Sequence, residues 1–385
     1  MKIMEYEFEQ GPIRPPSEAK SLLIRVTRNC PWNKCAFCQC YRGTKFELRT
    51  VEEIRKDIQR AREIADDIIS LSWKMGEAGR VSRPVAMAVF DEQGRYSDNY
   101  RSVAAWLYFG GESVFLQDAN SIIMKTDDLL AVLADIRETF PFVRRITSYC
   151  RSKTAARKSV EEYTLLRDAG LSRIHIGLES GYDPLLKFIR KGVTAAEHIE
   201  GGRRIVESGI SLSEYIMPGL GGQEWSSEHA RETARVLNEI DPDFIRIRTL
   251  QVRRGSELFR LMEEGGFVPL GDEAVVREIR EFMMNLEGIG STVVSDHILN
   301  LLEEVTGTLP RDREKMIAVI DRYFALSDED RRIFRLGRRR GIYRGLDDLR
   351  DARMYGTLKS LVAEYRDEAP DKFDRDLSAL MSNYI

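Results

Sequence analysis

The chain has 385 residues and a formal net charge of −3 at pH 7. This length allows two domains, or one large α/β barrel with an extension. The small net charge gives the whole molecule no electrostatic bias toward nucleic acids. No apolar stretch reaches the roughly 20 residues that span a bilayer, and the N-terminus lacks the apolar segment of a signal peptide. We therefore expect a cytoplasmic protein with no membrane partner, in which clustered cysteines bind metal rather than form disulfides.

The first informative segment follows the predicted first strand. Residues 1–20 are expected to form an irregular arm, and the apolar run over residues 22–26 predicts a strand. Cys30, Cys35 and Cys38 come directly after it. Thiolate is the ligand that iron–sulfur clusters prefer. Three thiolates on one loop can hold three irons of a four-iron cluster and leave the fourth iron open. The alternative is a structural zinc site with Cys40 as fourth ligand.

Strands and helices alternate after this loop. A capping box at Thr50 and Glu53 predicts the start of a long helix. We predict strands over residues 104–109, 143–149, 173–178, 210–217 and 244–248, and helices over 125–139, 158–169, 194–208 and 225–239. Such alternation favours a parallel sheet with right-handed crossovers. With the first strand, these six strands predict an α/β fold, a partial (β/α)6 barrel of the TIM type over residues 21–255.

The pattern changes near residue 256. Strand signals become rare, and helical stretches dominate near residues 272–286, 295–305, 311–324 and 346–366. We therefore predict a mostly helical C-terminal domain or lid over residues 256–385.

Polar and glycine-rich segments follow several of the predicted strands. They are the cysteine loop, Gly110-Gly111-Glu112, Glu179-Ser180-Gly181 and residues 218–222. In barrels, chemistry takes place on the loops that follow the carboxyl ends of the strands. Paired glycines let backbone approach a ligand, and a carboxylate accepts two hydrogen bonds. The alternative for each segment is an ordinary turn, but their shared position predicts one site.

These segments together resemble the radical S-adenosylmethionine (SAM) superfamily. The resemblance rests on the cysteine loop with Phe37 before its last cysteine, on Gly110-Gly111-Glu112, and on the run Ile174 to Gly181 followed by Lys191. This last run is similar to the coproporphyrinogen-oxidase-like and methylthiotransferase-like branches. The resemblance covers residues 20–250. Four residues separate Cys30 from Cys35, where three are usual in the superfamily.

The resemblance implies an enzyme with two cofactors. Cys30, Cys35 and Cys38 would hold a [4Fe–4S] cluster, and its open iron would bind the amino and carboxylate groups of SAM. An electron from the cluster, supplied by a reductant such as flavodoxin or ferredoxin, would cleave SAM to methionine and a 5′-deoxyadenosyl radical. That radical would abstract hydrogen from a substrate, while the protein positions the cofactor and excludes side reactions.

The resemblance also implies which residues contact SAM. They would be Phe37, Gly110, Gly111, Glu112, Glu179, Ser180, Lys191, Met217 and Pro218. Backbone at Gly110 to Glu112 would meet the amino group of SAM, and Glu179 and Ser180 would lie near its ribose and methionine parts. Lys191 would pair with the carboxylate of SAM, or it is an exposed loop lysine. Met217 and Pro218 would contact the adenine.

Three further features leave alternatives open. Cys40 and Cys150 are each either a thiol near the site or a buried packing residue, and Cys150 is the candidate catalytic thiol. The basic segment Arg331–Arg344 could bind phosphate or RNA, or form a helix end. We expect a small-molecule or anionic substrate. The alternatives are a zinc-stabilised RNA-binding module and a radical SAM methyl or methylthio transferase acting on RNA. The lack of a second cysteine group disfavours methylthiolation.

Overall fold

The computed structural model describes residues 7–91, 96–365, 368 and 372–381. The chain divides into two compact units, which are described separately below. The first unit holds residues 1–33, 40–176 and 204–212. The second holds residues 34–39, 177–203 and 213–385. Within the described ranges, no helix is both long enough and apolar enough to span a bilayer.

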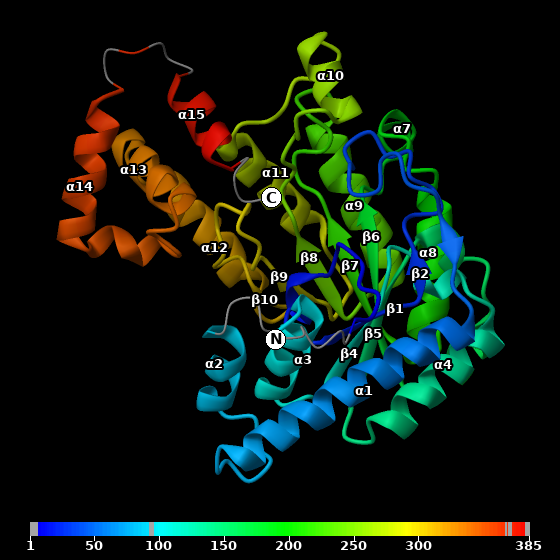
Figure 1. Ribbon diagram of the computed structural model, residues 1–385. Helices are drawn as coiled ribbons and strands as arrows, with labels where there is room; N and C mark the ends of the chain where they lie inside the picture. The colour runs from blue at the N-terminus through cyan, green and yellow to red at the C-terminus, as the bar shows by residue number, and fades with distance from the viewer. Residues whose placement is uncertain (1–6, 92–95, 366–367, 369–371, 382–385) are drawn as a thin grey trace. The chain divides into compact units, whose positions relative to one another are not determined.

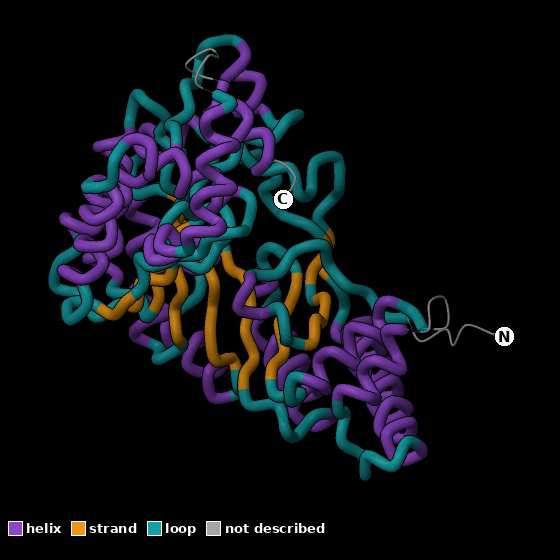
Figure 2. Tube along the Cα trace, turned by 90° about the vertical axis from the view of Figure 1, so that its left-hand side faces the viewer, coloured by secondary structure: helices purple, strands orange, loops and turns teal. Residues whose placement is uncertain are grey.

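The central feature of the fold is a mostly parallel sheet with strand order β1-β4-β5-β6-β7-β8-β9-β10. The strands are β1 (Leu22–Arg25), β4 (Ser113–Gln117), β5 (Arg145–Cys150), β6 (Leu171–Glu179), β7 (Ser211–Ile216), β8 (Phe244–Ile247), β9 (Thr292–Val294) and β10 (Gly307–Thr308). The strands can be followed in orange in Figure 2. β9 and β10 pair antiparallel, whereas β8 and β9 pair parallel. The predicted α/β class, with the parallel sheet of a partial barrel, is confirmed.

In the first unit, an amphipathic helix packs beside the strands. α1 (Val51–Lys74) begins at the predicted capping box of Thr50 and Glu53, and its apolar face buries Ile54, Ile58 and Ile68. α1 lies beside α4 (Thr126–Thr139), as Figure 1 shows. The unit also contains α2 (Arg83–Asp91), α3 (Asp98–Tyr108), α5 (Ser152–Ala155), α6 (Val160–Asp168), η1 (Pro16–Glu18) and η2 (Ser121–Ile123). A short ribbon of β2 (Thr27–Arg28) and β3 (Glu47–Leu48) flanks the cysteine loop.

The strand predicted over residues 104–109 is wrong. Residues 104–108 complete α3, which begins at the N-cap Ser97 and buries Tyr100, Val103 and Trp106. The strand follows instead at Ser113–Gln117. A short apolar run does not distinguish a buried strand from the end of a buried helix, because neither shows a clear period.

The second unit contributes most of the remaining helices. They are α7 (Asp183–Phe188), α9 (Ser226–Ile240), α10 (Glu257–Glu263), α11 (Asp272–Asn285), α12 (Arg313–Phe324), α13 (Asp328–Arg339), α14 (Ala352–Ala363), α15 (Lys372–Met381) and η3 (Leu346–Arg350). α8 (Ala195–Glu207) has residues in both units. In this unit α9 packs against α11, and α13 packs against α14 and α15. β9 and β10 lie beyond residue 256 and belong to the same sheet as the earlier strands. The domain boundary at residue 256 stays a prediction.

The helix predicted over residues 295–305 is wrong. Residues 295–302 form no helix or strand. Asn300 explains this conformation, because its amide donates to the carbonyl of Ile247, at 2.8 Å, and to the hydroxyl of Ser295, at 3.1 Å. These bonds fasten the segment to the end of β8.

Candidate active site

Part of the cysteine loop is anchored within the second unit. The amide of Ala36 donates to the carbonyl of Ile189 at 2.8 Å, and the amide of Leu258 donates to the carbonyl of Ala36 at 2.9 Å. Ala36 lies between Cys35 and Cys38 in sequence and is fully buried. These bonds fix the segment that carries two of the three predicted sulfur ligands against α7 and α10.

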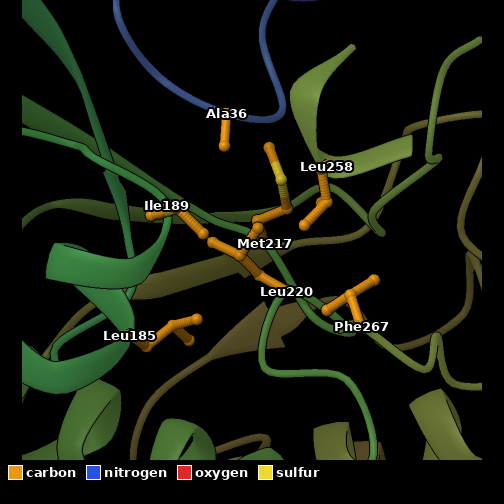
Figure 3. Close-up of a cluster of buried hydrophobic side chains, with 7 residues drawn as sticks. All are labelled: Ala36, Leu185, Ile189, Met217, Leu220, Leu258 and Phe267. Carbon is orange, nitrogen blue, oxygen red and sulfur yellow. The ribbon is translucent and has the colours of Figure 1, made fainter. Parts of the chain in front are cut away.

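An apolar cluster surrounds this anchor. It consists of Ala36, Leu185, Ile189, Met217, Leu220, Leu258 and Phe267, shown in Figure 3. Phe37 packs against the cluster. Met217 is the first residue beyond β7, and 8% of its surface is exposed. The structure thus brings Phe37 and Met217, two predicted cofactor residues, to one apolar cluster.

Glu179 and Lys191 form a half-buried ion pair near this surface. The Lys191 Nζ lies 3.0 Å from Glu179 Oε1, and each side chain is 13% exposed. Lys191 Nζ also lies 5.9 Å from the ring centroid of Phe37. Glu179 has a left-handed backbone with φ of 64°, and a Cβ at Gly177 would come within 2.2 Å of Glu179 Oε1. A side chain at position 177 would therefore displace the Glu179 carboxylate from its present position.

Sequence reasoning missed Glu214, the third charged residue of this group. The side chain is fully buried in β7, and neither carboxylate oxygen has a hydrogen-bond partner among the described residues. Burial raises the pKa of Glu214 well above its usual value, while Lys191 lowers it and Glu179 raises it further. Burial thus favours the neutral acid. A glutamate within a predicted strand was the available signal, because a carboxylate is rarely buried without a partner.

Ser180 takes part in a buried network that holds the ends of β6 and β7. Its hydroxyl lies 2.9 Å from His229 Nδ1, and His229 Nε2 lies 3.1 Å from the carbonyl of Met217. Glu278 of α11 accepts from the amide of Gly219 at 2.7 Å and from the hydroxyl of Ser226 at 2.6 Å. Burial raises the pKa of Glu278, and His229 opposes this. The network ties both strand ends to α9 and α11.

In the first unit, Asp118 holds the two ends of the cysteine loop. This fully buried carboxylate accepts from Arg25 at 2.7 Å, from the amide of Asn29 at 3.1 Å, and from the hydroxyl of Tyr41. Burial and then Asp118 raise the pKa of Tyr41. Asn29 precedes Cys30 and Tyr41 follows Cys40, so one carboxylate braces the loop from both sides. Sequence reasoning did not single out Asp118.

The predicted roles of Gly110, Gly111 and Glu112 do not match their position. These residues precede β4 rather than follow a strand. β1 and β4 are parallel, so the three residues lie at the opposite end of this strand pair from the cysteine loop. Glu112 pairs with Arg144 at 3.4 Å on the surface. The error follows from placing a strand at 104–109, and the segment that follows β4 is Asp118 to Asn120.

Cys150 ends β5 and is 3% exposed. Its thiol lies 3.3 Å from the carbonyl of Arg151. Burial and then Cys150 raise the pKa of Tyr163 in α6. This environment is that of a packing residue, and the catalytic role of Cys150 stays a prediction.

The cysteines of the loop fit an iron–sulfur ligand set by their chemistry. No disulfide joins any of the five cysteines, and Cys30, Cys35 and Cys38 are partly exposed. The amide of Asn33 lies 3.4 Å from the Cys30 sulfur, a type of contact that tunes clusters. Within the described ranges, no three His, Cys, Asp or Glu side chains form a ready-made metal site. Metal binding and the folding of such a loop are coupled. The three cysteines stay predicted ligands because of their donor chemistry, not because of a preformed geometry.

Residues 91–235 match the family described as the Radical SAM superfamily. This segment is therefore similar to radical SAM domains, a class of enzyme domain that uses a [4Fe–4S] cluster and SAM. The matched segment covers β4 to most of α9 and begins after the cysteine loop. The subgroup is not defined by this match.

Two curated relatives show partial similarity. The chain is 24% identical over 120 residues to a tRNA uridine(34) acetyltransferase of Methanocaldococcus jannaschii, covering 31% of this chain and 22% of that protein. It is 25% identical over 231 residues to the 4′-phospho-dehydrooxetanocin synthase of Priestia megaterium, covering 57% of this chain and 27% of that protein. The chain thus spans about a quarter of each relative's length.

Solved structures show similarity at lower sequence identity. The radical SAM methyltransferase TsrM from Kitasatospora setae, with cobalamin and a [4Fe–4S] cluster bound, matches at a TM-score of 0.44 and 13% identity, over 93% of this chain and 65% of that chain. Elp3 of Methanocaldococcus infernus matches at a TM-score of 0.40 and 14% identity, over 72% and 57% of the two chains.

Proposed function

We propose that this enzyme cleaves SAM reductively at a [4Fe–4S] cluster held by Cys30, Cys35 and Cys38. The observation that carries the proposal is the grouping of Phe37, Lys191, Glu179 and Met217 around the anchored segment between Cys35 and Cys38. When bound, the reduced cluster supplies the electron that splits SAM into methionine and the 5′-deoxyadenosyl radical, which abstracts hydrogen from the substrate.

The charged residues account for the polar parts of SAM. Lys191 offers an ammonium group to the carboxylate of SAM, in exchange for its pairing with Glu179. Glu179 then accepts hydrogen bonds from the ribose hydroxyls. Glu214 offers a buried carboxyl that lacks a partner in the protein. A sulfonium cation in its vicinity would favour the ionised carboxylate and remove the cost of burying it unpaired.

The apolar residues position the adenine and exclude water. Met217, with Phe37 beside it, presents an apolar surface at the end of β7. Ser180, His229 and Glu278 hold the backbone of this strand end in place. Exclusion of water protects a reactive radical from side reactions.

Anaerobic reconstitution tests the ligand assignment. We expect about four irons per chain in the wild type, and an electron paramagnetic resonance (EPR) signal of the reduced cluster that changes when SAM is added. The Cys30→Ala/Cys35→Ala/Cys38→Ala variant should bind no cluster. Cys40→Ala is the matched control and should bind it normally. Zinc in place of iron in the wild type, or a signal that SAM leaves unchanged, would contradict the proposal.

A second candidate is a radical SAM methyl or methylthio transferase acting on RNA. The name of one relative, a tRNA uridine(34) acetyltransferase, favours RNA as the substrate. The basic segment gives it no support, since Arg335, Arg338 and Arg339 are buried and bound to Asp272, Glu303 and Asp374. The zinc-stabilised RNA-binding module depended on the same arginines. Salt-sensitive tRNA binding that is lost in Arg340→Gln/Arg344→Gln would revive both alternatives.

A further inference from the structure

The segment that follows β8 is unusually basic. Residues 244–256 contain four arginines, Arg246, Arg248, Arg253 and Arg254, and no carboxylate. β8 and β9 are parallel, with Arg246 opposite Val294. Arg248 and His297 therefore leave the sheet at the same edge, just beyond the carboxyl ends of neighbouring strands, where barrel enzymes bind ligands.

Three hydrogen bonds fix the backbone around Arg248. The amide of Arg248 donates to the carbonyl of Ile216 at 3.0 Å. Asn300 accepts from the amide of Thr249 at 3.0 Å and donates to the carbonyl of Ile247 at 2.8 Å. The start of the Arg248 side chain is thus fixed by hydrogen bonds at both neighbouring residues.

The guanidinium of Arg248 has no carboxylate partner in the part of the chain that the structure describes. Its neighbour in the strand differs, because Arg246 is 7% exposed, donates to Ser213 at 3.2 Å and lies 3.4 Å from Asp296. Arg248 is half-buried. A half-buried guanidinium without a counterion is an unusual feature, because such groups are normally paired.

His297 adds a hydrogen-bond donor beside Arg248. Its Nδ1 lies 3.2 Å from the amide of Leu299, which donates to it. The neutral ring therefore carries its proton on Nε2. Burial and then Arg248 lower the pKa of His297 to about 4. At neutral pH the ring is uncharged and offers one N–H.

Two arginines of α13 donate hydrogen bonds to backbone carbonyls of the loop that carries His297. Arg338 Nε donates to the carbonyl of Asn300 at 3.2 Å, and Arg339 Nη1 donates to the carbonyl of Leu299 at 2.8 Å. Arg338 is itself paired with Glu303 at 2.6 Å. Two arginines of the motif noted in the sequence thus stabilise this loop rather than contact an RNA.

We propose that Arg248 and the Nε2–H of His297 bind an oxyanion group of the substrate, a phosphate or a carboxylate. This inference rests on the proposed function, since it names the substrate class for that site. A planar guanidinium can give two parallel N–H bonds to either group, and the imidazole N–H can give a third.

Inorganic phosphate and acetate serve as probes on the reconstituted enzyme. We expect a saturable rise in melting temperature, above that of potassium chloride at matched ionic strength. Phosphate alone giving the rise assigns a phosphoryl group, and acetate giving it assigns a carboxylate. Arg248→Met should weaken the binding at least tenfold, and His297→Gln should weaken it less. Arg254→Met, which alters an exposed arginine of the same segment, is the control and should bind as the wild type. No saturable rise with either probe, or wild-type binding in Arg248→Met, overturns the proposal.

The same preparations separate this proposal from the function itself. Arg248→Met should keep its cluster and the change of the EPR signal on adding SAM. If wild-type protein binds phosphate but SAM leaves the signal unchanged, the proposed function fails and the oxyanion site stands. If SAM changes the signal but neither probe binds, the function stands and the oxyanion site fails.

Discussion

Two acidic residues of the second unit have opposite environments. Asp272, at the start of α11, pairs with Arg335 and Arg339. Burial would raise its pKa, but Arg339 and Arg335 outweigh burial and lower the pKa to about 2. Glu214 in β7 is fully buried, and its oxygens have no partner in the described part of the chain. Burial raises its pKa well above the usual value.

The difference separates a structural carboxylate from one that is placed to meet a ligand. Asp272 is satisfied by the protein and joins α11 to α13. Glu214 is left unsatisfied, which costs stability unless a bound molecule supplies the missing partner. Perturbed carboxyls without protein partners are enriched at functional sites for this reason. The comparison predicts that removing each residue changes stability in opposite directions.

The largest effect is expected for Asp272→Ala. It leaves the buried guanidiniums of Arg335 and Arg339 without a main partner, so we expect a loss of about 3–5 kcal/mol in the free energy of unfolding. Urea denaturation measures it. Asp328→Ala, whose side chain is 91% exposed, is the control and should change stability by about 0.5 kcal/mol or less. Equal losses in the free energy of unfolding for the two variants would show that Asp272 has no special structural role.

The lowered pKa of Asp272 predicts that the free energy of unfolding depends on pH. The pKa of Asp272 is about 2 in the folded state and about 3.9 in an unfolded chain. Its stabilisation is therefore complete above about pH 4 and is lost as the pH falls toward 2. The wild type should lose more stability than Asp272→Ala over this interval in acid denaturation. If the stability of both proteins falls equally between pH 4 and pH 2, the pairing of Asp272 with Arg335 and Arg339 is contradicted.

Glu214→Met should stabilise the protein in the absence of SAM. The change removes a buried carboxyl without a partner, so we expect a gain of about 1–3 kcal/mol. Because the folded-state pKa is raised, the penalty grows as the pH rises above the unfolded value. The gain should therefore be larger at pH 8 than at pH 4. The variant should also lose SAM binding, and a destabilised variant that binds SAM normally would refute the comparison.

Lys191→Met is expected to act on SAM binding more than on stability. Its ion pair with Glu179 keeps partial contact with solvent, since each side chain is 13% exposed. We expect the KM for SAM to rise about tenfold, equal to about 1.4 kcal/mol. Lys187→Met, which alters an exposed lysine of α7, should leave the KM unchanged. An unchanged KM in Lys191→Met would remove Lys191 from the cofactor site.

The smallest effect is expected within the basic segment. Arg340 is exposed, whereas Arg339 is 4% exposed and pairs with Asp272. Arg340→Gln should change the free energy of unfolding by about 0.5 kcal/mol or less. Arg339→Gln should destabilise the protein severalfold more in the same urea measurement. Similar values would mean that the segment is not divided into buried and surface arginines.

Much of the sheet could be predicted from the sequence. The runs that became β1, β5, β6, β7 and β8 each contain several apolar or β-branched residues. Buried parallel strands have this pattern. The strand assigned to residues 104–109 failed because a helix end and a buried strand look alike over six residues. That error also moved Gly110, Gly111 and Glu112 to the wrong end of β4.

The structure brings Phe37, Glu179, Lys191 and Met217 close to one another. Their roles in binding SAM stay predictions. Glu214, Asp118 and His229 were missed because their importance lies in long-range contacts. A glutamate in a predicted strand signals that its carboxylate could be buried, but the sequence does not show whether that carboxylate is paired. The roles of the α13 arginines stayed open for the same reason, since the acidic partners of Arg335, Arg338 and Arg339 lie on other segments.

The most direct test of the central claim is the formation of 5′-deoxyadenosine. Reconstituted wild-type enzyme, reduced with dithionite and supplied with SAM, should release 5′-deoxyadenosine and methionine in equal amounts by mass spectrometry. The Cys30→Ala/Cys35→Ala/Cys38→Ala variant should release none. If iron-loaded wild-type protein releases no more 5′-deoxyadenosine than that variant, the account is contradicted.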